Sequence, residues 1–413
     1  MMLEVYHRVF LLTCPPTLTL QTKRTRSMAA LFAGVGFSAT GFIALVTVTP
    51  LVAEDLLGSS RWSGFPSSLA IVGTAFGTTW LSAVMSRHGR KKGLLVGYFT
   101  AAAAASVAAL GAGLELFPLL AVAIFGLGAG YGASRLSRYA ASDLYAPEQQ
   151  ARAISWVVWA GTFGSVLGPT LLEPSRRFSV SLGGSSTVGP FLLVALAMGA
   201  AGTVVWLGLP KDSHRPSGRP RARATFDQLR TPNAQTALLA LVVGQVVMLL
   251  IMTMTPVHIR GAGGGLSSIG IVIAAHTFGM YALSPLSGWL CDRIGRRPTI
   301  VVAGTLLVTA AVTSATAGSS TPHLATGLFL LGWGWNLGFV AGSALLTESV
   351  PQEDRMPVQG LADSIVWTSA AVAGLSSGLL QDLAGFAVLC SVGAVMALAP
   401  MSFVTFRRPI RGV

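Results

Sequence analysis

Long runs of apolar residues, separated by short polar stretches, dominate the pattern of the chain. A helix of about 20 residues crosses the roughly 30 Å hydrocarbon core of a bilayer, and the runs have about this length. The pattern therefore predicts an all-α integral membrane protein with twelve transmembrane helices. These are expected at residues 28–52, 62–86, 93–113, 116–139, 153–172, 187–209, 234–256, 266–290, 298–318, 323–346, 358–380 and 385–405.

The polar stretches divide the chain into parts. Residues 210–233 are basic and rich in proline, which indicates a linker between two bundles. We expect six-helix bundles at 28–209 and 234–406, with cytoplasmic tails at 1–27 and 407–413. The apolar patch in the first tail is too short for a secretory signal. The alternative is that translation begins at Met28 rather than Met1.

Composition and charge favour the same interpretation. Only 10% of the 413 residues are charged, against about 25% in a soluble domain. The net charge of +13 is compatible with binding to nucleic acid, but 24 of the 28 Lys and Arg residues fall on one side of the predicted topology. Cytoplasmic loops carry such an excess, so both termini are expected in the cytoplasm of a bacterial cell, with the chain in its plasma membrane and no nucleic-acid partner. The exceptions are Arg61, Arg176, Arg177 and Arg260.

The three cysteines have no shared spacing, so no disulfide, metal site or cofactor is expected. An internal repeat is more informative. Thr47–Pro50 matches Thr253–Pro256, and Arg87–Lys91 matches Arg293–Arg297, both at an offset of 206 residues. Two parallel six-helix halves are typical of transporters that alternate access around a site at the midplane.

The stretch Gly288–Arg297 resembles the loop signature of the major facilitator superfamily. The first copy of this stretch has Ser82 at the glycine position and Ser86 at the aspartate position. The resemblance implies a monomeric secondary transporter of a small organic solute, with no enzymatic activity. It also implies a cluster of charges that latches the two halves together on the cytoplasmic side.

The expected members of this latch are loop glycines, arginines and nearby acids. They are Ser86, Arg87, Gly89, Arg90, Asp143, Gly288, Asp292, Arg293, Gly295, Arg296, Glu348 and Asp363. We predict the ion pairs Arg90–Asp143 and Arg296–Glu348; the alternative is that these arginines only enforce topology. Asp363 is expected to replace the carboxylate missing at Ser86 by pairing with Arg87 or Arg90. The other possibility is that Asp363 titrates and couples protons to transport.

The fifth predicted span contains Gly161, Gly164, Gly168 and Pro169, which resemble a motif of drug–proton antiporters. Small residues and a proline at this spacing predict close packing and a bend. The arginine that such antiporters carry in span four is replaced by Val122. We expect Arg135 and Arg138 near the cytoplasmic interface instead, with Trp367 as an interface anchor.

The resemblance implies that spans one, four, seven and ten line a cavity. Its expected residues are Thr40, Thr47, Tyr131, Gln245, Met248, Met252, His276, Trp333, Trp335 and Asn336. Only one of the two tryptophans should face the cavity, because they are two positions apart on a helix. This set contains no acid and suits an uncharged or amphipathic solute. Proton-coupled export is the leading prediction; the alternatives are proton-coupled uptake and a membrane sensor that no longer transports.

Overall fold

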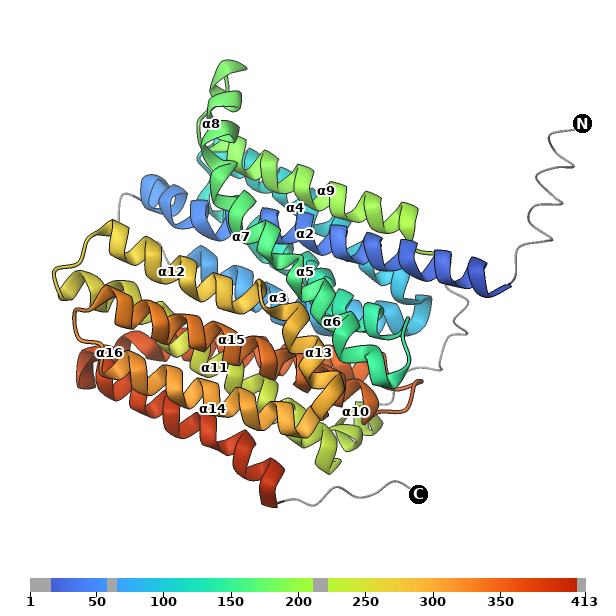
Figure 1. Ribbon diagram of the computed structural model, residues 1–413. Helices are drawn as coiled ribbons and strands as arrows, with labels where there is room; N and C mark the ends of the chain where they lie inside the picture. Colours follow the sequence, from blue (N-terminus) through green and yellow to red (C-terminus); the bar gives the residue numbers. More distant parts are fainter. Residues whose placement is uncertain (1–15, 58–64, 211–221, 407–413) are drawn as a thin grey trace, which may run out of the picture.

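The computed structural model describes residues 16–57, 65–210 and 222–406, and these residues form helices joined by turns, without a strand (Figure 1). This confirms the predicted all-α fold. The first half consists of α2 (Pro16–Leu57), α3 (Phe65–His88), α4 (Arg90–Gly113), α5 (Phe117–Ser142), the short helix η2 (Pro147–Gln149), α6 (Gln150–Trp159), α7 (Gly161–Thr170), α8 (Leu172–Ser181) and α9 (Val188–Gly208).

The linker contains a short helix, α10 (Ala222–Leu229). The second half consists of α11 (Pro232–Gly261), α12 (Leu266–Tyr281), α13 (Ser284–Ile294), α14 (Arg296–Ala315), α15 (Thr321–Glu348) and α16 (Arg355–Phe406). Two predicted spans are each broken into two helices, at Ala160 and at Ala282–Leu283, which the hydropathy pattern did not indicate.

Ten of the helices in the described parts of the chain are long and apolar enough to cross a membrane, or eleven if the bent path through α6, α7 and α8 is one crossing. The element α16 has 52 residues and consists of two helices, about 45 Å and about 31 Å long at 1.5 Å per residue, each enough for one crossing. Gly385 interrupts it with a φ of 80°, between the two spans expected there. The count of twelve crossings stays a prediction.

Two tight turns define what we call the basic end of the bundle. Gly89 joins α3 to α4 with a φ of 92°, and Gly295 joins α13 to α14 with a φ of 94°. Glycine adopts this left-handed region without the steric penalty of a side chain. Arginines follow both glycines directly, and the basic end lies on the right of Figure 1.

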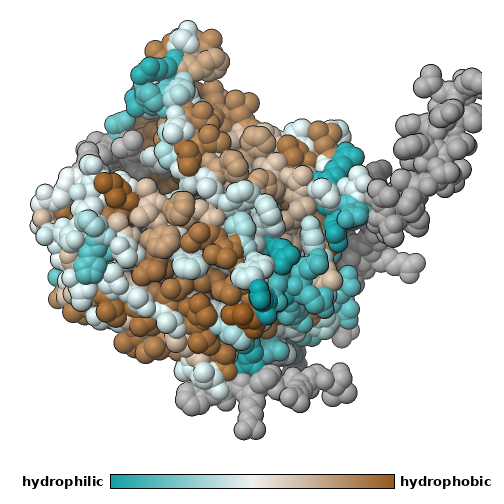
Figure 2. Space-filling model, in the orientation of Figure 1, coloured by the Kyte–Doolittle hydropathy of each residue, from teal (hydrophilic) through white to brown (hydrophobic). Residues whose placement is uncertain are grey.

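The apolar core is arranged in three clusters. One lies within the first half and one within the second half. The third joins the halves and includes Met85, Tyr139, Ile154, Leu346 and Val358, which lie near the basic end. Apolar side chains also cover the middle of the outer face, while hydrophilic ones gather toward the basic end (Figure 2). An apolar outer belt is what contact with lipid tails requires.

Candidate functional site

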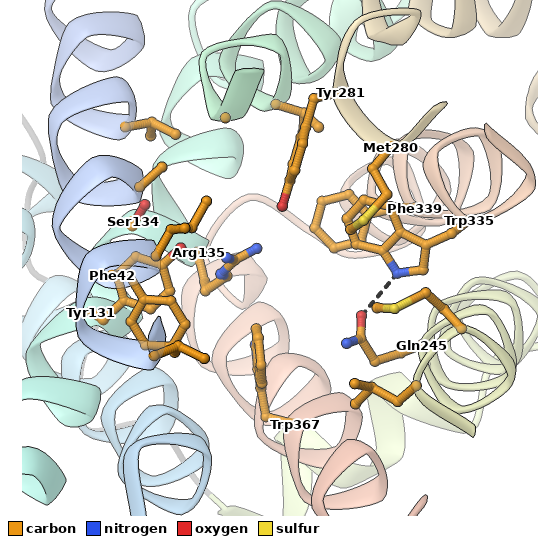
Figure 3. A pocket seen from close by; sticks show the side chains of 18 of the residues that line it. Phe42, Tyr131, Ser134, Arg135, Gln245, Met280, Tyr281, Trp335, Phe339 and Trp367 are labelled. Atoms are coloured by element: carbon orange, nitrogen blue, oxygen red, sulfur yellow. Dashed lines mark hydrogen bonds between the residues drawn. The ribbon is translucent and has the colours of Figure 1, made fainter. Parts of the chain in front are cut away.

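A cavity of about 330 Å³ lies between the two halves. It is walled by α2, α3, α5, α6 and α7 of the first half and by α11, α12, α15 and α16 of the second (Figure 3). Thr47 and Ser67 border the cavity at the end farther from the basic end. Arg138 lies at the end nearer the basic end, which we call the floor of the cavity. The described lining contains two arginines and no carboxylate.

Aromatic rings from both halves make up much of the wall. Phe42 stacks on Tyr131 with 3.8 Å between ring centroids, and Trp335 stacks on Phe339 at 4.8 Å. Tyr281 meets the edge of Trp335 at 6.3 Å. Such flat apolar surfaces suit a planar organic molecule, because aromatic rings prefer stacked and edge-to-face contacts.

A polar contact fixes the wall on the side of the second half. The indole Nε1 of Trp335 donates a hydrogen bond to Oε1 of Gln245 at 2.9 Å. Both side chains are buried, so each satisfies the other where water has little access. The contact joins α15 to α11 and holds the ring of Trp335 against the cavity (Figure 3).

Most residues expected to line a cavity do so. Those in its wall are Thr47, Tyr131, Gln245, Met248, Met252, His276 and Trp335. The prediction was wrong for Thr40, Trp333 and Asn336. The hydroxyl of Thr40 bonds to the carbonyl of Gly36 on its own helix, and Thr40 lies where Gly164 of α7 packs closely.

The other two misplaced residues lie on α15. Trp333 is about 200° around the helix from Trp335 and packs on Phe329 instead. The amide nitrogen of Asn336 donates to the Met280 carbonyl at 2.7 Å and to Ser284 Oγ at 3.1 Å. Asn336 therefore supports the break between α12 and α13 rather than the cavity.

The expectation that Arg135 lies near the interface was also wrong, because its side chain reaches into the cavity (Figure 3). Its Nη2 donates to the hydroxyl of Tyr131 at 2.5 Å. Its guanidinium carbon is 4.9 Å from the ring centre of Tyr131 and 5.0 Å from that of Trp367. Trp367, expected as an interface anchor, is thus a wall residue. The spacing of Tyr131 and Arg135, one helical turn apart on one face, is the sequence signal that could have placed Arg135 in the cavity.

Arg138 forms an ion pair with Asp363 across the two halves. Its Nη2 is 2.5 Å from Oδ1 of Asp363, and the side chains are 3% and 2% exposed. Arg138 Nε also donates to Ser343 Oγ at 2.9 Å. The expected pairing of Asp363 with Arg87 or Arg90 is therefore wrong. Gln359, four residues earlier and about 6 Å along the helix, occupies that place and accepts from Arg90 Nη2 at 2.8 Å.

The two predicted loop pairs are formed at the basic end. Arg90 is 2.8 Å from Asp143, and Arg296 is 2.7 Å from Glu348. Each pair lies within one half, but neighbouring contacts cross between halves. Arg355 approaches Asp143 at 3.9 Å, and Arg296 donates to the carbonyl of Pro147.

The remaining loop residues differ in their roles. Asp292 accepts from the backbone N–H of Arg152 at 3.0 Å, near the start of α6, where a carboxylate is favoured by the helix dipole. It is also 2.8 Å from Arg296. Ser86 bonds only to the carbonyl of Ala83 on its own helix among the contacts described. Arg87 is exposed, and Arg293 lies over the ring of Trp289.

Glycines allow the halves to cross closely at the basic end. A Cβ at Gly288 would lie 2.1 Å from Ser155 Oγ, and a Cβ at Gly360 would lie 2.0 Å from Ser82 Oγ. Each crossing therefore pairs one glycine with one serine, from opposite halves. The close approach requires the missing side chain, because real Cβ contacts are longer than this.

The fifth-span glycines also pack tightly. A Cβ would lie 2.4 Å from Ala39 at Gly164, 3.0 Å from Ile43 at Gly168, and 2.7 Å from the ring of Tyr281 at Gly161. Pro169 lies near the end of α7, and the chain bends by 45° on passing into α8. The motif residues therefore occur at close contacts and at a bend.

Comparison with known proteins identifies relatives over nearly the whole chain. The sequence model of the Major Facilitator Superfamily matches residues 31–271 and 236–412. The uncharacterized MFS-type transporter YdeG of Bacillus subtilis (strain 168) is 33% identical over 394 residues, which are 92% of this chain and 90% of the relative. The riboflavin transporter RfnT of Brucella anthropi is 29% identical over 346 residues, 83% of this chain and 85% of the relative.

Solved structures of similar fold are more distant in sequence. A bacterial homologue of the iron transporter ferroportin, in an outward-facing state, superposes with a TM-score of 0.74 at 16% identity, over 92% of this chain and 98% of that one. The transporter FucP, in the outward conformation, gives a TM-score of 0.76 at 15% identity with the same coverage.

Proposed function

Because the chain belongs to the major facilitator superfamily, whose members are membrane transporters and not enzymes, we propose that it is a secondary active transporter of a small amphipathic organic solute. The observation that carries this proposal is the cavity between the halves, with aromatic walls and a floor of cross-half polar contacts. A site between two halves that can rock against each other is what alternating access requires.

We assign the basic end to the cytoplasm, since cytoplasmic loops carry the excess of Lys and Arg. The contacts between halves near this end then act as a closed inner gate. They include Arg138–Asp363, Arg90–Gln359 and the two glycine–serine crossings. In this assignment the cavity belongs to a state that faces outward.

Proton exchange is the coupling that this gate favours. A proton that enters from outside and neutralises Asp363 removes the charge that holds Arg138, which weakens the inner gate and favours the inward-open state. There the proton leaves and the solute binds, and the ion pair forms again as the protein returns outward. This sequence moves a proton inward and a solute outward, which is the leading prediction of export. Val122 is 71% exposed on the outside of the bundle, so the arginine of known drug–proton antiporters has no counterpart at that position.

Transport by purified protein in liposomes tests the proposal. The vesicles carry an imposed pH gradient and are offered riboflavin, aromatic carboxylates, their neutral amides and aromatic amines. Accumulation in vesicles that are acidic inside supports exchange with protons. Accumulation only when the outside is acidic would replace export with uptake by symport. If no solute moves under either gradient, while empty liposomes behave identically, the proposed transport is overturned and a sensor becomes the better explanation.

A further inference from the structure

The charges near the floor of the cavity do not balance. Arg138 is neutralised by Asp363, with which it forms a fully buried ion pair. Arg135, one turn away on α5, has no carboxylate among the described residues that line the cavity. Two arginines and one aspartate leave one net positive charge in a space enclosed by apolar helices.

An unbalanced charge at this depth is expensive, and such residues mark substrate pathways in membrane proteins. The rings of Tyr131 and Trp367 offset part of the cost through cation–π contacts. The Tyr131 hydroxyl accepts from Nη2 of Arg135, but neither ring provides an acceptor for the Nε of this guanidinium. Its Nε is buried without a hydrogen-bond partner, although backbone and side-chain donors in such places are nearly always satisfied.

We infer that Arg135 is the anchor for the anionic group of the solute, and that the solute is a planar aromatic carboxylate with a single negative charge. This inference rests on the proposed transport function and narrows its substrate class. The guanidinium is a flat fork of donors that matches a carboxylate in a bidentate manner. One carboxylate supplies the missing charge and accepts from the guanidinium, whose hydrogen bonds are incomplete without it.

The rest of the cavity accounts for the planar aromatic part. The stacked pairs Phe42–Tyr131 and Trp335–Phe339 present flat surfaces, and Tyr281 lies between them near Arg135 (Figure 3). The volume of about 330 Å³ is at the small end of the roughly 300–1,000 Å³ range of ligand pockets. A molecule with one or two fused rings is therefore the expected size.

Calorimetric titration of the protein in lipid nanodiscs tests the inference, with 2-naphthoate and its neutral isostere 2-naphthamide as probes. We expect 2-naphthoate to bind at least ten-fold more tightly than 2-naphthamide. Arg135→Gln should reduce this preference to two-fold or less, and Arg135→Lys should keep part of it. The control Arg260→Gln removes an exposed arginine outside the cavity and should leave the preference unchanged.

Equal binding of the two probes, no binding of 2-naphthoate, or an unchanged preference in Arg135→Gln would each overturn the inference. If Arg135→Gln does not fold, the comparison of the two probes in the unmodified protein and in Arg135→Lys still decides. Transport separates the two proposals. Movement of amides or amines but not of carboxylates would leave the transporter standing and remove the anion site. Arg135-dependent binding of 2-naphthoate without transport of any solute would support the anion site and overturn the proposed transport.

Discussion

Replacing Asp363 by asparagine should open the basic end of the bundle. The substitution keeps the shape of the side chain and one oxygen acceptor, but it removes the charge that lies 2.5 Å from Arg138. Removing one partner of a buried ion pair costs about 3–5 kcal/mol, because the other charge is left uncompensated. Both side chains are at most 3% exposed, so solvent screens little of this cost while the gate is closed.

Opening of the basic end relieves that cost, because water then reaches Arg138. A free-energy difference of about 1.4 kcal/mol changes a population ratio tenfold. If most of the cost is relieved, Asp363→Asn should shift the equilibrium toward the open basic end by roughly 100- to 1,000-fold. Lowering the pH should move the unmodified protein in the same direction, since protonation of Asp363 also removes its charge, whereas Asp363→Asn should no longer respond through this group.

Distances between spin labels on the two signature loops report the opening. His88→Cys and Ile294→Cys place the labels at exposed positions at the ends of α3 and α13, in a chain whose native Cys14, Cys291 and Cys390 are replaced. The matched control is Asp227→Asn, which removes a carboxylate from an exposed surface pair with Arg230. A folded Asp363→Asn protein whose label distances equal those of the control would refute the gate. The double variant Arg138→Gln, Asp363→Asn should be more stable than Asp363→Asn alone, because it leaves no buried charge unpaired.

Three further substitutions test other contacts. Gly288→Ala should lower the melting temperature and lengthen the label distances, since overpacking costs about 1–3 kcal/mol. Adding Ser155→Gly should restore both in part, because it removes the side chain at 2.1 Å but leaves the Ala151 carbonyl at 2.9 Å. Gly378→Ala, with open space around it, should change neither. Gln245→Leu should destabilise the protein by about 1–3 kcal/mol in thermal unfolding, because it leaves the buried Nε1 of Trp335 without an acceptor. Adding Trp335→Phe should recover part of the lost stability. Full stability of Gln245→Leu would contradict the prediction. Asp292→Asn should open the basic end less than Asp363→Asn, since a charge at a helix terminus contributes about 0.3–2 kcal/mol. Arg296 also retains its ion pair with Glu348. An equal or larger opening would argue against this ranking of the two contacts.

The positions of the helices could be predicted because a lipid core demands long apolar runs, and these are visible without any tertiary information. The break at Ala160 could not be, because no proline or charge lies beside it. For the break at Ala282–Leu283 the sequence does hold a signal, Pro285 in the first turn of α13, but hydropathy does not register it, and Asn336, which supports this break, comes from a distant helix.

The cavity residues were predictable where the hydropathy pattern gave both the depth of a residue in the membrane and the helix face on which it lies, as for Gln245 and Trp335. Arg135 was missed because an arginine is expected to reach for the interface, whereas here Tyr131 and Trp367 hold it inside. The partner of Asp363 was predicted wrongly because Gln359, one helical turn earlier, takes the expected contact with Arg90, and Asp363 pairs with Arg138. Hydropathy does not resolve such a shift, because span boundaries are uncertain by several residues.

The internal repeat continues into the interface, but the charges depart from it. The crossings Gly288–Ser155 and Ser82–Gly360 are the same contact with glycine and serine exchanged between halves. The helices α5 and α15 correspond at an offset of 204 residues, because Gly128 packs on Ala70 as Gly332 packs on His276. Gly342 therefore corresponds to Arg138.

The offset of 204 pairs Phe339 with Arg135, and the offset of 205 that relates Ser155 to Gly360 pairs Val158 with Asp363. The charged groups of the cavity and its floor therefore lie on α5 and α16, while their counterparts on α15 and α6 are neutral. A symmetric scaffold allows the halves to rock, and this one-sided charge would let a solute bind in only one orientation, with its anionic end toward α5.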